Sequence, residues 1–256
     1  MSAPAPFSDA WFDALVALVF EAGDAIRAVA EGGQLAVEEK ADASPVTAAD
    51  HAAEAILSAG LRRLTPTWPQ RSEEQIPPAP AQRAQWSRFW LIDPLDGTKE
   101  FLAGNGEYTV NVALIEDGRP VLGLVGVPGQ GRVYLGWVPA QRALCITAQG
   151  HRTVLRTRPC ATPPVVVASR RHRGEALESL LHALGEAAPG LQTRAVGSAL
   201  KLVVLAAGQA SSANVIGWRR NVGFYRNFVV CLLFYESILT NSRNNATLYQ
   251  SRIGRK

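Results

Sequence analysis

Apolar residues recur at helical spacing from Ser8 to Glu31, and Gly32-Gly33 follow directly. This pattern predicts an amphipathic helix with Ser8 as its N-cap. A second helix is predicted to begin at Thr47, because Thr47 and Asp50 have the spacing of a capping box. The stretch KADASPVTAAD, which joins the two, predicts a loop. Residues 64–87 are rich in Pro, Gln and Arg and predict a long surface connection.

The period then changes from that of a helix to the two-residue alternation of strands. Alternation predicts four strands that form an antiparallel sheet, at residues 88–92, 108–115, 121–127 and 132–137. A further strand is predicted at 165–168, followed by helices at 174–184 and 198–207. This order predicts an α+β protein in three parts: an N-terminal α+β domain (1–138), a C-terminal α/β domain (139–210) and a tail (211–256) of unknown structure.

Composition narrows the class of protein. The chain has 256 residues, of which 47% are hydrophobic, enough for a sizeable core. Three widely spaced cysteines give neither a disulfide framework nor a zinc pattern, and the N-terminus does not read as a secretory signal, so we expect a cytoplasmic protein. The longest apolar run, 228–235, is well short of the ~20 residues of a membrane span.

The net charge of +4 comes from the tail. Residues 209–256 hold seven Lys or Arg and one acidic residue, Glu236, whereas residues 1–208 are slightly acidic. This distribution does not favour a nucleic-acid partner. It leaves peripheral contact of the tail with the inner face of a membrane as an alternative, although the tail does not separate its basic and apolar residues cleanly.

The stretch WLIDPLDGTKEF places two carboxylates, Asp93 and Asp96, at the end of a predicted strand, with Gly97 and Thr98 behind them. Mg²⁺ is held by carboxylates together with substrate phosphate, so this group and the upstream Glu73-Glu74 pair predict a metal and phosphate site. Pro94 sets the bend that turns the carbonyl of Leu95 toward the same centre. The alternative is a turn with helix-capping aspartates.

Three further groups have both a functional and a structural interpretation. Asp50 either takes a proton from the attacking water or only completes the capping box, and Lys40 beside it reads as a solvated lysine. The cluster Ser169-Arg170-Arg171-His172-Arg173 after the 165–168 strand is an anion site or a solvated loop. Gly197, Ser198 and Lys201 bind an anion or simply start a helix.

Together, the stretches KADASPVTAAD, SEE, WLIDPLDGTKEF, NGEYTVNVALIEDGRPVLGLVGVP, ASRRHR and GSALKL resemble the inositol monophosphatase superfamily. Within it they are most similar to 3′(2′),5′-bisphosphate nucleotidases of the CysQ type. The resemblance covers residues ~10 to 210 and implies the layered αβαβα sugar-phosphatase fold. It also implies a magnesium-dependent, lithium-sensitive phosphatase that converts adenosine 3′,5′-bisphosphate to AMP and phosphate, in sulfur assimilation.

The resemblance also implies roles for individual residues. Two or three Mg²⁺ ions would be bound by Glu73, Asp93, Asp96 and the Leu95 carbonyl, and Asp50, Thr98 and Glu73 would be catalytic. The substrate, a phosphorylated nucleotide, would contact a longer set: Leu95, Asp96, Gly97, Thr98, Ser169, His172, Gly197, Ser198 and Lys201.

The resemblance stops near Ala210. The family continues with a Trp-Asp-Thr-Ala-Ala motif whose aspartate binds metal, but this chain has no aspartate after Asp117. A frameshifted or recombined C-terminus would explain the change. We therefore expect an incomplete C-terminal part, one weakened metal site and impaired catalysis. An inositol or sugar monophosphatase, or a catalytically dead paralogue that binds a nucleotide or a partner, remains the alternative.

Overall fold

The computed structural model describes residues 3–33, 37–39, 45–156, 161–170, 175–210 and 212–213. The tail beyond Ala213, and with it the expected incomplete C-terminal part, lies outside these residues. Two long helices open the described chain, α1 (Asp9–Glu31) and α2 (Ala48–Leu64). Ser8 caps α1, and Thr47 caps α2 in a capping box with Asp50, as the sequence predicts.

A seven-stranded sheet follows, in the order β3-β4-β5-β6-β7-β8-β9. Its strands pair antiparallel except β3 with β4, which are parallel. The strands are β3 (Gln70–Ser72), β4 (Arg88–Asp96), β5 (Thr109–Glu116), β6 (Arg119–Val127), β7 (Arg132–Trp137), β8 (Arg142–Thr147) and β9 (Arg152–Val154). Three short helical segments join them: α3 (Pro80–Arg83), α4 (Thr98–Leu102) and the 3₁₀ turn η1 (Pro128–Gln130).

A second, parallel sheet of three strands has the order β11-β10-β12. It contains β10 (Val165–Ser169), β11 (Gln192–Val196) and β12 (Ser212–Ala213), and the helices of this part are α5 (Glu175–Ala187) and α6 (Leu200–Ala206). A small antiparallel pair, β1 (Val37–Glu39) with β2 (Pro45–Thr47), leads into α2.

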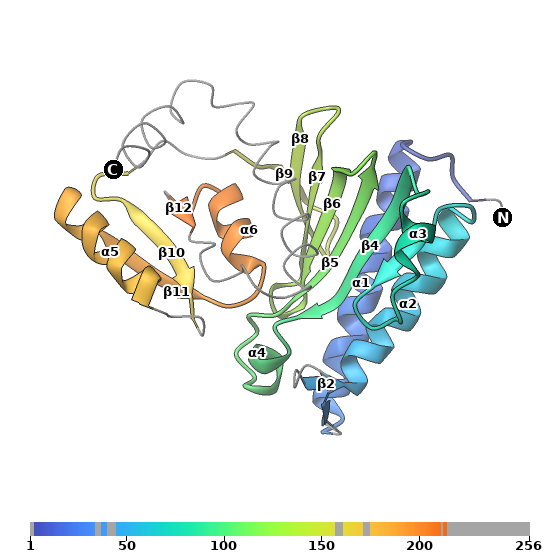
Figure 1. Ribbon diagram of the computed structural model, residues 1–256, viewed down its shortest axis with the longest axis horizontal. Helices are drawn as coiled ribbons and strands as arrows, with labels where there is room; N and C mark the ends of the chain where they lie inside the picture. Colours follow the sequence, from blue (N-terminus) through green and yellow to red (C-terminus); the bar gives the residue numbers. More distant parts are fainter. Residues whose placement is uncertain are drawn as a thin grey trace.

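These elements stack in five layers (Figure 1). From left to right the figure shows α5, the three-stranded sheet, α6, the seven-stranded sheet, and the α1–α2 pair. The αβαβα order confirms the predicted fold class over the described residues. One apolar cluster lies between α1, α2 and the large sheet, and a second lies between the other face of that sheet and α6.

The predicted four-strand sheet was too small, because β3, β8 and β9 also belong to it. β3 and β9 are edge strands, as is β11 in the other sheet, and an edge strand of three to five residues buries too little for an apolar pattern. β8 does bury Leu144 and Ile146 two residues apart, a pattern that predicts a strand. Residue 138 lies between β7 and β8, which pair with each other, so the change of sheet comes after Val154.

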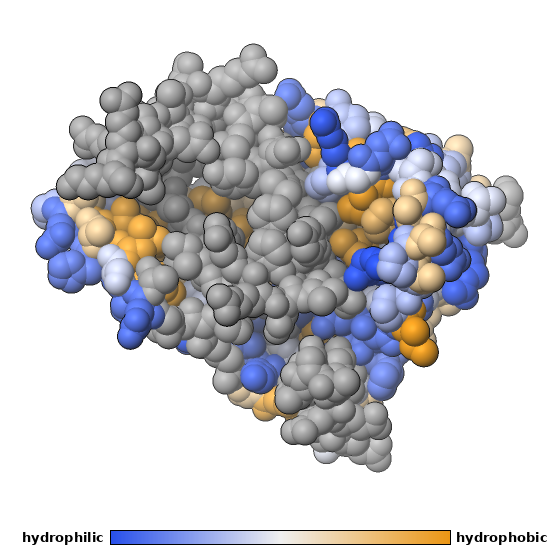
Figure 2. Space-filling view, viewed as in Figure 1, coloured by the Kyte–Doolittle hydropathy of each residue, from blue (hydrophilic) through white to orange (hydrophobic). Residues whose placement is uncertain are grey.

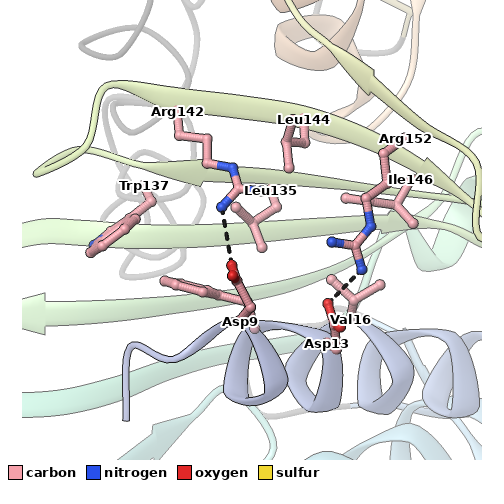
Figure 3. Close-up of a pocket in the computed structure, with 10 residues that line it drawn as sticks. Asp9, Asp13, Val16, Leu135, Trp137, Arg142, Leu144, Ile146 and Arg152 are labelled. Atoms are coloured by element: carbon pink, nitrogen blue, oxygen red, sulfur yellow. Dashed lines mark hydrogen bonds and ion pairs between the residues drawn. The ribbon is translucent and has the colours of Figure 1, made fainter.

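α1 is tied to the late strands of the large sheet by charge as well as by apolar packing. Asp9 pairs with Arg142 of β8 at 3.5 Å and Asp13 pairs with Arg152 of β9 at 2.5 Å, beside the apolar contact of α1 with β7 and β8 (Figure 3). Exposed ion pairs of this kind contribute about 0–1 kcal/mol each. The apolar contact therefore dominates, and the two ion pairs add little to it.

The outer helix α5 is amphipathic. Glu178, His182 and Glu186 recur four residues apart and are exposed, whereas Leu177 is buried. In Figure 2 the outermost left edge, where α5 lies, is hydrophilic, and a hydrophobic patch lies just inside it. Within the described part of the chain, no helix has the length and hydropathy needed to cross a membrane.

We expect two glycine-to-alanine substitutions to change stability in opposite directions. A Cβ on Gly126 of β6 would lie 2.6 Å from Val19 Cγ1 of α1 and 3.3 Å from Val110 Cβ, so Gly126→Ala should lower the free energy of unfolding by about 1–3 kcal/mol. Gly185 in α5 has no atom within 4 Å of such a Cβ, so Gly185→Ala should raise it by up to about 1 kcal/mol. Urea unfolding of both variants tests this, and unchanged stability in Gly126→Ala would contradict the close packing of α1 on the sheet.

Candidate active site

The end of β4 carries the two aspartates of the DPLDG stretch. Trp90 and Ile92 fill the core, and Asp93 is itself buried at 4% exposure. β4 pairs with β5 up to Asp93 and again at Asp96, with a shift of register between them. This irregularity takes Pro94 and Leu95 out of the regular ladder. A core strand therefore ends in two carboxylates, those of Asp93 and Asp96, and between them lies the carbonyl of Leu95, which is outside the regular pairing of β4 with β5.

The turn between β11 and α6 lies directly against this strand end. The backbone N–H of Ala199 donates to Asp96 Oδ2 at 2.6 Å, although the two residues are 103 positions apart. Gly97 has a φ of 92°, and a Cβ there would lie 3.1 Å from Ser198 Cβ. The structure thus brings the predicted site residues of the first part together with those of the second.

Lys201 supplies positive charge on the second side. It is buried at 2% exposure, and its Nζ donates to the Ser198 carbonyl at 2.6 Å. Ser169, at the end of β10, is also buried and pairs in register with Val196, the residue before Gly197. These predicted substrate contacts therefore converge on one turn. His172 and Lys40 lie outside the described residues.

Asp96 is the carboxylate on which the charges of Lys201, Glu73 and Glu100 all act. Burial raises its pKa to about 6, against the positive charge of Lys201 and the Ala199 hydrogen bond, which lower it; the negative charges of Glu73 and Glu100 raise it further. Repulsion among carboxylates in a poorly solvated site is what a bound cation would offset. Glu100, buried in α4, was not predicted from the sequence, because it reads as an ordinary helical glutamate.

An ion pair that the sequence did not predict, between Glu107 and Arg170, holds the β11–α6 turn in place. Glu107 binds Arg170 with both carboxylate oxygens, through Nε at 3.0 Å and Nη2 at 2.7 Å. Glu107 Oε2 also accepts the N–H of Gly197 at 2.8 Å, and Arg170 Nη2 donates to the Ala195 carbonyl at 3.1 Å. Arg170 is therefore engaged by a carboxylate of this chain. Arg170, which was predicted to belong to an anion site, therefore has a structural role. The only sequence signal for Glu107 was its place in the NGEYTV stretch.

Asp50 completes the capping box of α2. Its Oδ2 accepts the backbone N–H of Thr47 at 2.8 Å and the Thr47 hydroxyl at 2.7 Å, and the side chain is 1% exposed. α4, which begins at Thr98, packs beside β2, which ends at Thr47. α2, which carries Asp50, also packs beside β2, so the elements of Asp50 and Thr98 share one neighbour, and the capping role of Asp50 does not exclude a chemical one. The Thr98 hydroxyl meets the Leu95 carbonyl at 3.5 Å, a long contact.

Glu73 is placed beside β4 by the backbone. Its N–H donates to the Ile92 carbonyl at 3.1 Å, one residue before Asp93. The groups at the end of β4 that could bind a metal ion are the carboxylates of Glu73, Asp93 and Asp96 and the Leu95 carbonyl. Oxygen ligands of this kind are the ones that Mg²⁺ prefers. In the described part of the chain, no three His, Cys, Asp or Glu side chains form a ready metal cage. Asp96, whose Oδ2 faces Ala199, would have to share its carboxylate between that N–H and a cation.

Comparisons with known proteins point to one family. A sequence model described as the inositol monophosphatase family matches residues 8–219. The chain is 46% identical over 199 residues to the 3′(2′),5′-bisphosphate nucleotidase CysQ of Escherichia coli O157:H7, covering 77% of each chain. It is 47% identical over 194 residues to the protein of the same name from Salmonella typhimurium, covering 75% of each.

A solved structure agrees. The crystal structure of CysQ from Bacteroides thetaiotaomicron, described as a bacterial member of the inositol monophosphatase family, superposes with a TM-score of 0.68 at 28% identity, covering 80% of this chain and 79% of the other. The sequence and structural comparisons therefore agree on family and fold.

The Glu107 carboxylate should make the stability of the protein depend on pH. Burial would raise its pKa, but the hydrogen bonds from Arg170 and Gly197 and the nearby positive charges lower it below 4.5. Its contribution to stability is therefore full above pH 4.5 and is lost as the pH falls through the lower, folded-state pKa. We expect Glu107→Gln to cost about 1 kcal/mol at neutral pH, since Arg170 is partly exposed, and less in acid.

Urea unfolding across acid and neutral pH measures this difference between the unsubstituted protein and Glu107→Gln. Glu21→Gln, at an exposed position of α1, is the control. A gap between Glu107→Gln and the unsubstituted protein that does not narrow in acid would show that the charge of Glu107 does not stabilise the turn.

Proposed function

The chain belongs to the inositol monophosphatase family, a family of phosphoric monoester hydrolases, and on that basis we propose that it removes the 3′-phosphate of adenosine 3′,5′-bisphosphate. Water attacks phosphorus, the bond from phosphorus to the 3′ oxygen breaks, and the products are AMP and inorganic phosphate. The observation that carries this proposal is the contact of Asp96 with Ala199, which joins the DPLDG carboxylates to the Gly197–Lys201 turn in one site. The nucleotide preference is supported by the relatives at 46–47% identity, which are 3′(2′),5′-bisphosphate nucleotidases by name.

Glu73, Asp93, Asp96 and the Leu95 carbonyl would hold Mg²⁺, which would neutralise charge developing on the phosphate oxygens and favour ionisation of the attacking water. Asp93 is buried and faces little competition from solvent, so it is the ligand on which binding would depend most. Glu73 approaches from β3, on the side of β4 opposite β5.

Asp50 and Thr98 would handle the proton of the attacking water. The two bonds from Thr47 to Oδ2 fix the orientation of the Asp50 carboxylate, as a general base requires. Thr98 would orient the water from the start of α4. Gly97, at a φ of 92°, allows the backbone to approach the scissile phosphate without a side chain in the way.

The second half of the substrate would lie against the β11–α6 turn. Lys201 and Ser198 supply a positive charge and a hydroxyl beside Asp96, and Ser169 lies at the adjacent strand end. His172, which lies outside the described residues, is assigned to this half by its place in the sequence three residues after Ser169. An inositol or sugar phosphate would use the same first half and differ in these contacts.

We propose further that catalysis is impaired. The resemblance implies a metal-binding aspartate after residue 210, and the sequence contains none beyond Asp117. One metal site would then lack a carboxylate, and the leaving oxygen would lose part of its stabilisation. A chain that binds the nucleotide, or another partner, without turning it over is the limiting case of the same defect.

Phosphate release from adenosine 3′,5′-bisphosphate, with Mg²⁺ titrated and Li⁺ added, tests the activity. We expect slow, lithium-sensitive release that Asp93→Asn lowers about a hundredfold or more, because a buried ligand is lost. Asp24→Asn, an exposed substitution on α1, should leave the rate unchanged.

Identification of the product decides between substrates. AMP as the product supports the nucleotidase, and faster release from inositol phosphate would replace it with the sugar-phosphatase alternative. No release at any Mg²⁺ concentration from folded protein that still binds the nucleotide would contradict an enzymatic role and leave binding as the function.

A further inference from the structure

Glu54 is a carboxylate inside the protein that the proposed reaction does not use. It lies on α2 one turn after Asp50 and is 8% exposed. Ser58 Oγ donates to its Oε1 at 2.6 Å, and Gln75 Nε2 donates to the same oxygen at 2.5 Å. Ser72 Oγ donates to Oε2 in a short hydrogen bond. Both carboxylate oxygens are therefore in use, and these partners are all neutral.

Two of these donors flank Glu73. Ser72 precedes it, and the Ser72 hydroxyl also accepts the N–H of Glu74 at 3.3 Å. Gln75 follows, and its Nε2 also reaches Ser58 Oγ at 3.0 Å. The side chain of Glu54 thus fastens the segment on both sides of Glu73 to α2.

The same segment is fastened to β4 by the bond from Glu73 N–H to the Ile92 carbonyl. Glu73 is therefore held between two fixed elements: β4, which carries Asp93, and α2, which carries Asp50. Burying a carboxylate among neutral donors costs free energy, and an apolar contact would join the segment to α2 more cheaply. A carboxylate is nevertheless suited to this place, because it accepts three donors at once, whereas an amide has a single acceptor oxygen.

We propose that Glu54 is a positioning residue for the metal site: it holds Ser72–Gln75 so that the Glu73 carboxylate stands beside Asp93 and Asp96. This inference rests on the proposed function. Substitution of groups that orient metal ligands typically weakens metal binding about 10- to 100-fold. Glu54 touches neither metal nor substrate, so its loss should act through Glu73.

The test is the dissociation constant of Mg²⁺, measured by calorimetry without substrate, together with the Mg²⁺ dependence of phosphate release. We expect Glu54→Gln to raise that constant at least about tenfold, with kcat largely restored at saturating Mg²⁺. Ser72→Ala should have a smaller effect of the same kind. The double variant should lose less than the two single losses added, because both substitutions disturb the same hydrogen bond, that from Ser72 to Glu54.

Thr65→Val is the matched control. Thr65, the C-cap of α2, is also buried and hydrogen-bonded: it accepts from Trp90 Nε1 at 2.8 Å and donates to the Leu61 carbonyl at 3.0 Å, and neither partner belongs to residues 72–75. It should lose stability in urea without any change in Mg²⁺ affinity.

Each result has a distinct meaning. Unchanged Mg²⁺ affinity in Glu54→Gln, with a loss of stability like that of Thr65→Val, would overturn the positioning role. If Glu54→Gln does not fold, Ser72→Ala decides in the same way, and wild-type affinity there would overturn it too. Failure of the unsubstituted protein to bind Mg²⁺ or release phosphate would instead contradict the proposed function on which the inference rests.

Discussion

Carboxylates withdrawn from water around the end of β4 are the constraint on which the arrangement of the protein depends. Asp93 and Glu100 are buried, and Asp96 is buried enough to have its pKa raised to about 6. Groups of like charge in such a place need donors or positive charge nearby. The second part of the chain supplies both, through the Ala199 N–H and Lys201. The contact between the end of β4 and the β11–α6 turn therefore has the same origin as the candidate chemistry.

The other side of the site is built by α2 and β3, and it follows the same logic. Asp50 accepts hydrogen bonds from Thr47 at the start of α2, and Glu54, one turn later, accepts them from Ser58 of the same helix and from Ser72 and Gln75. Without those hydrogen-bond donors, the two buried carboxylates on the face of α2 that is turned to the protein interior would destabilise the fold. The short strand β3 contributes little to the apolar core, and its value lies in carrying Glu73 to the edge of β4.

Local signals in the sequence predicted local features well. The capping box at Thr47, the helical period of α1 and the Asp-rich end of β4 each depend on residues within a few positions of one another. The partners of Glu107 were out of reach of such reasoning, because Arg170 lies 63 positions away and nothing in either neighbourhood marks the other. Glu54 was missed for a different reason: a glutamate in a helix usually faces solvent, and only the fold shows that this one faces β3.

The turn between β11 and α6 is held to the first part of the molecule by backbone groups. Asp96 takes the N–H of Ala199 and Glu107 takes that of Gly197, so on the second side no side chain is needed for either bond. The contact therefore constrains the sequence of the two sides differently: the first side needs particular side chains, and the second needs only backbone N–H groups. Acids at 96 and 107 are required for their carboxylates, whereas position 199 contributes only its amide hydrogen, which excludes proline, and its 1% exposure leaves room for a small side chain alone. A Cβ on Gly197 would lie 2.7 Å from Glu100 Cγ, so divergence of such proteins can keep this anchorage only where residues 197 and 199 stay small.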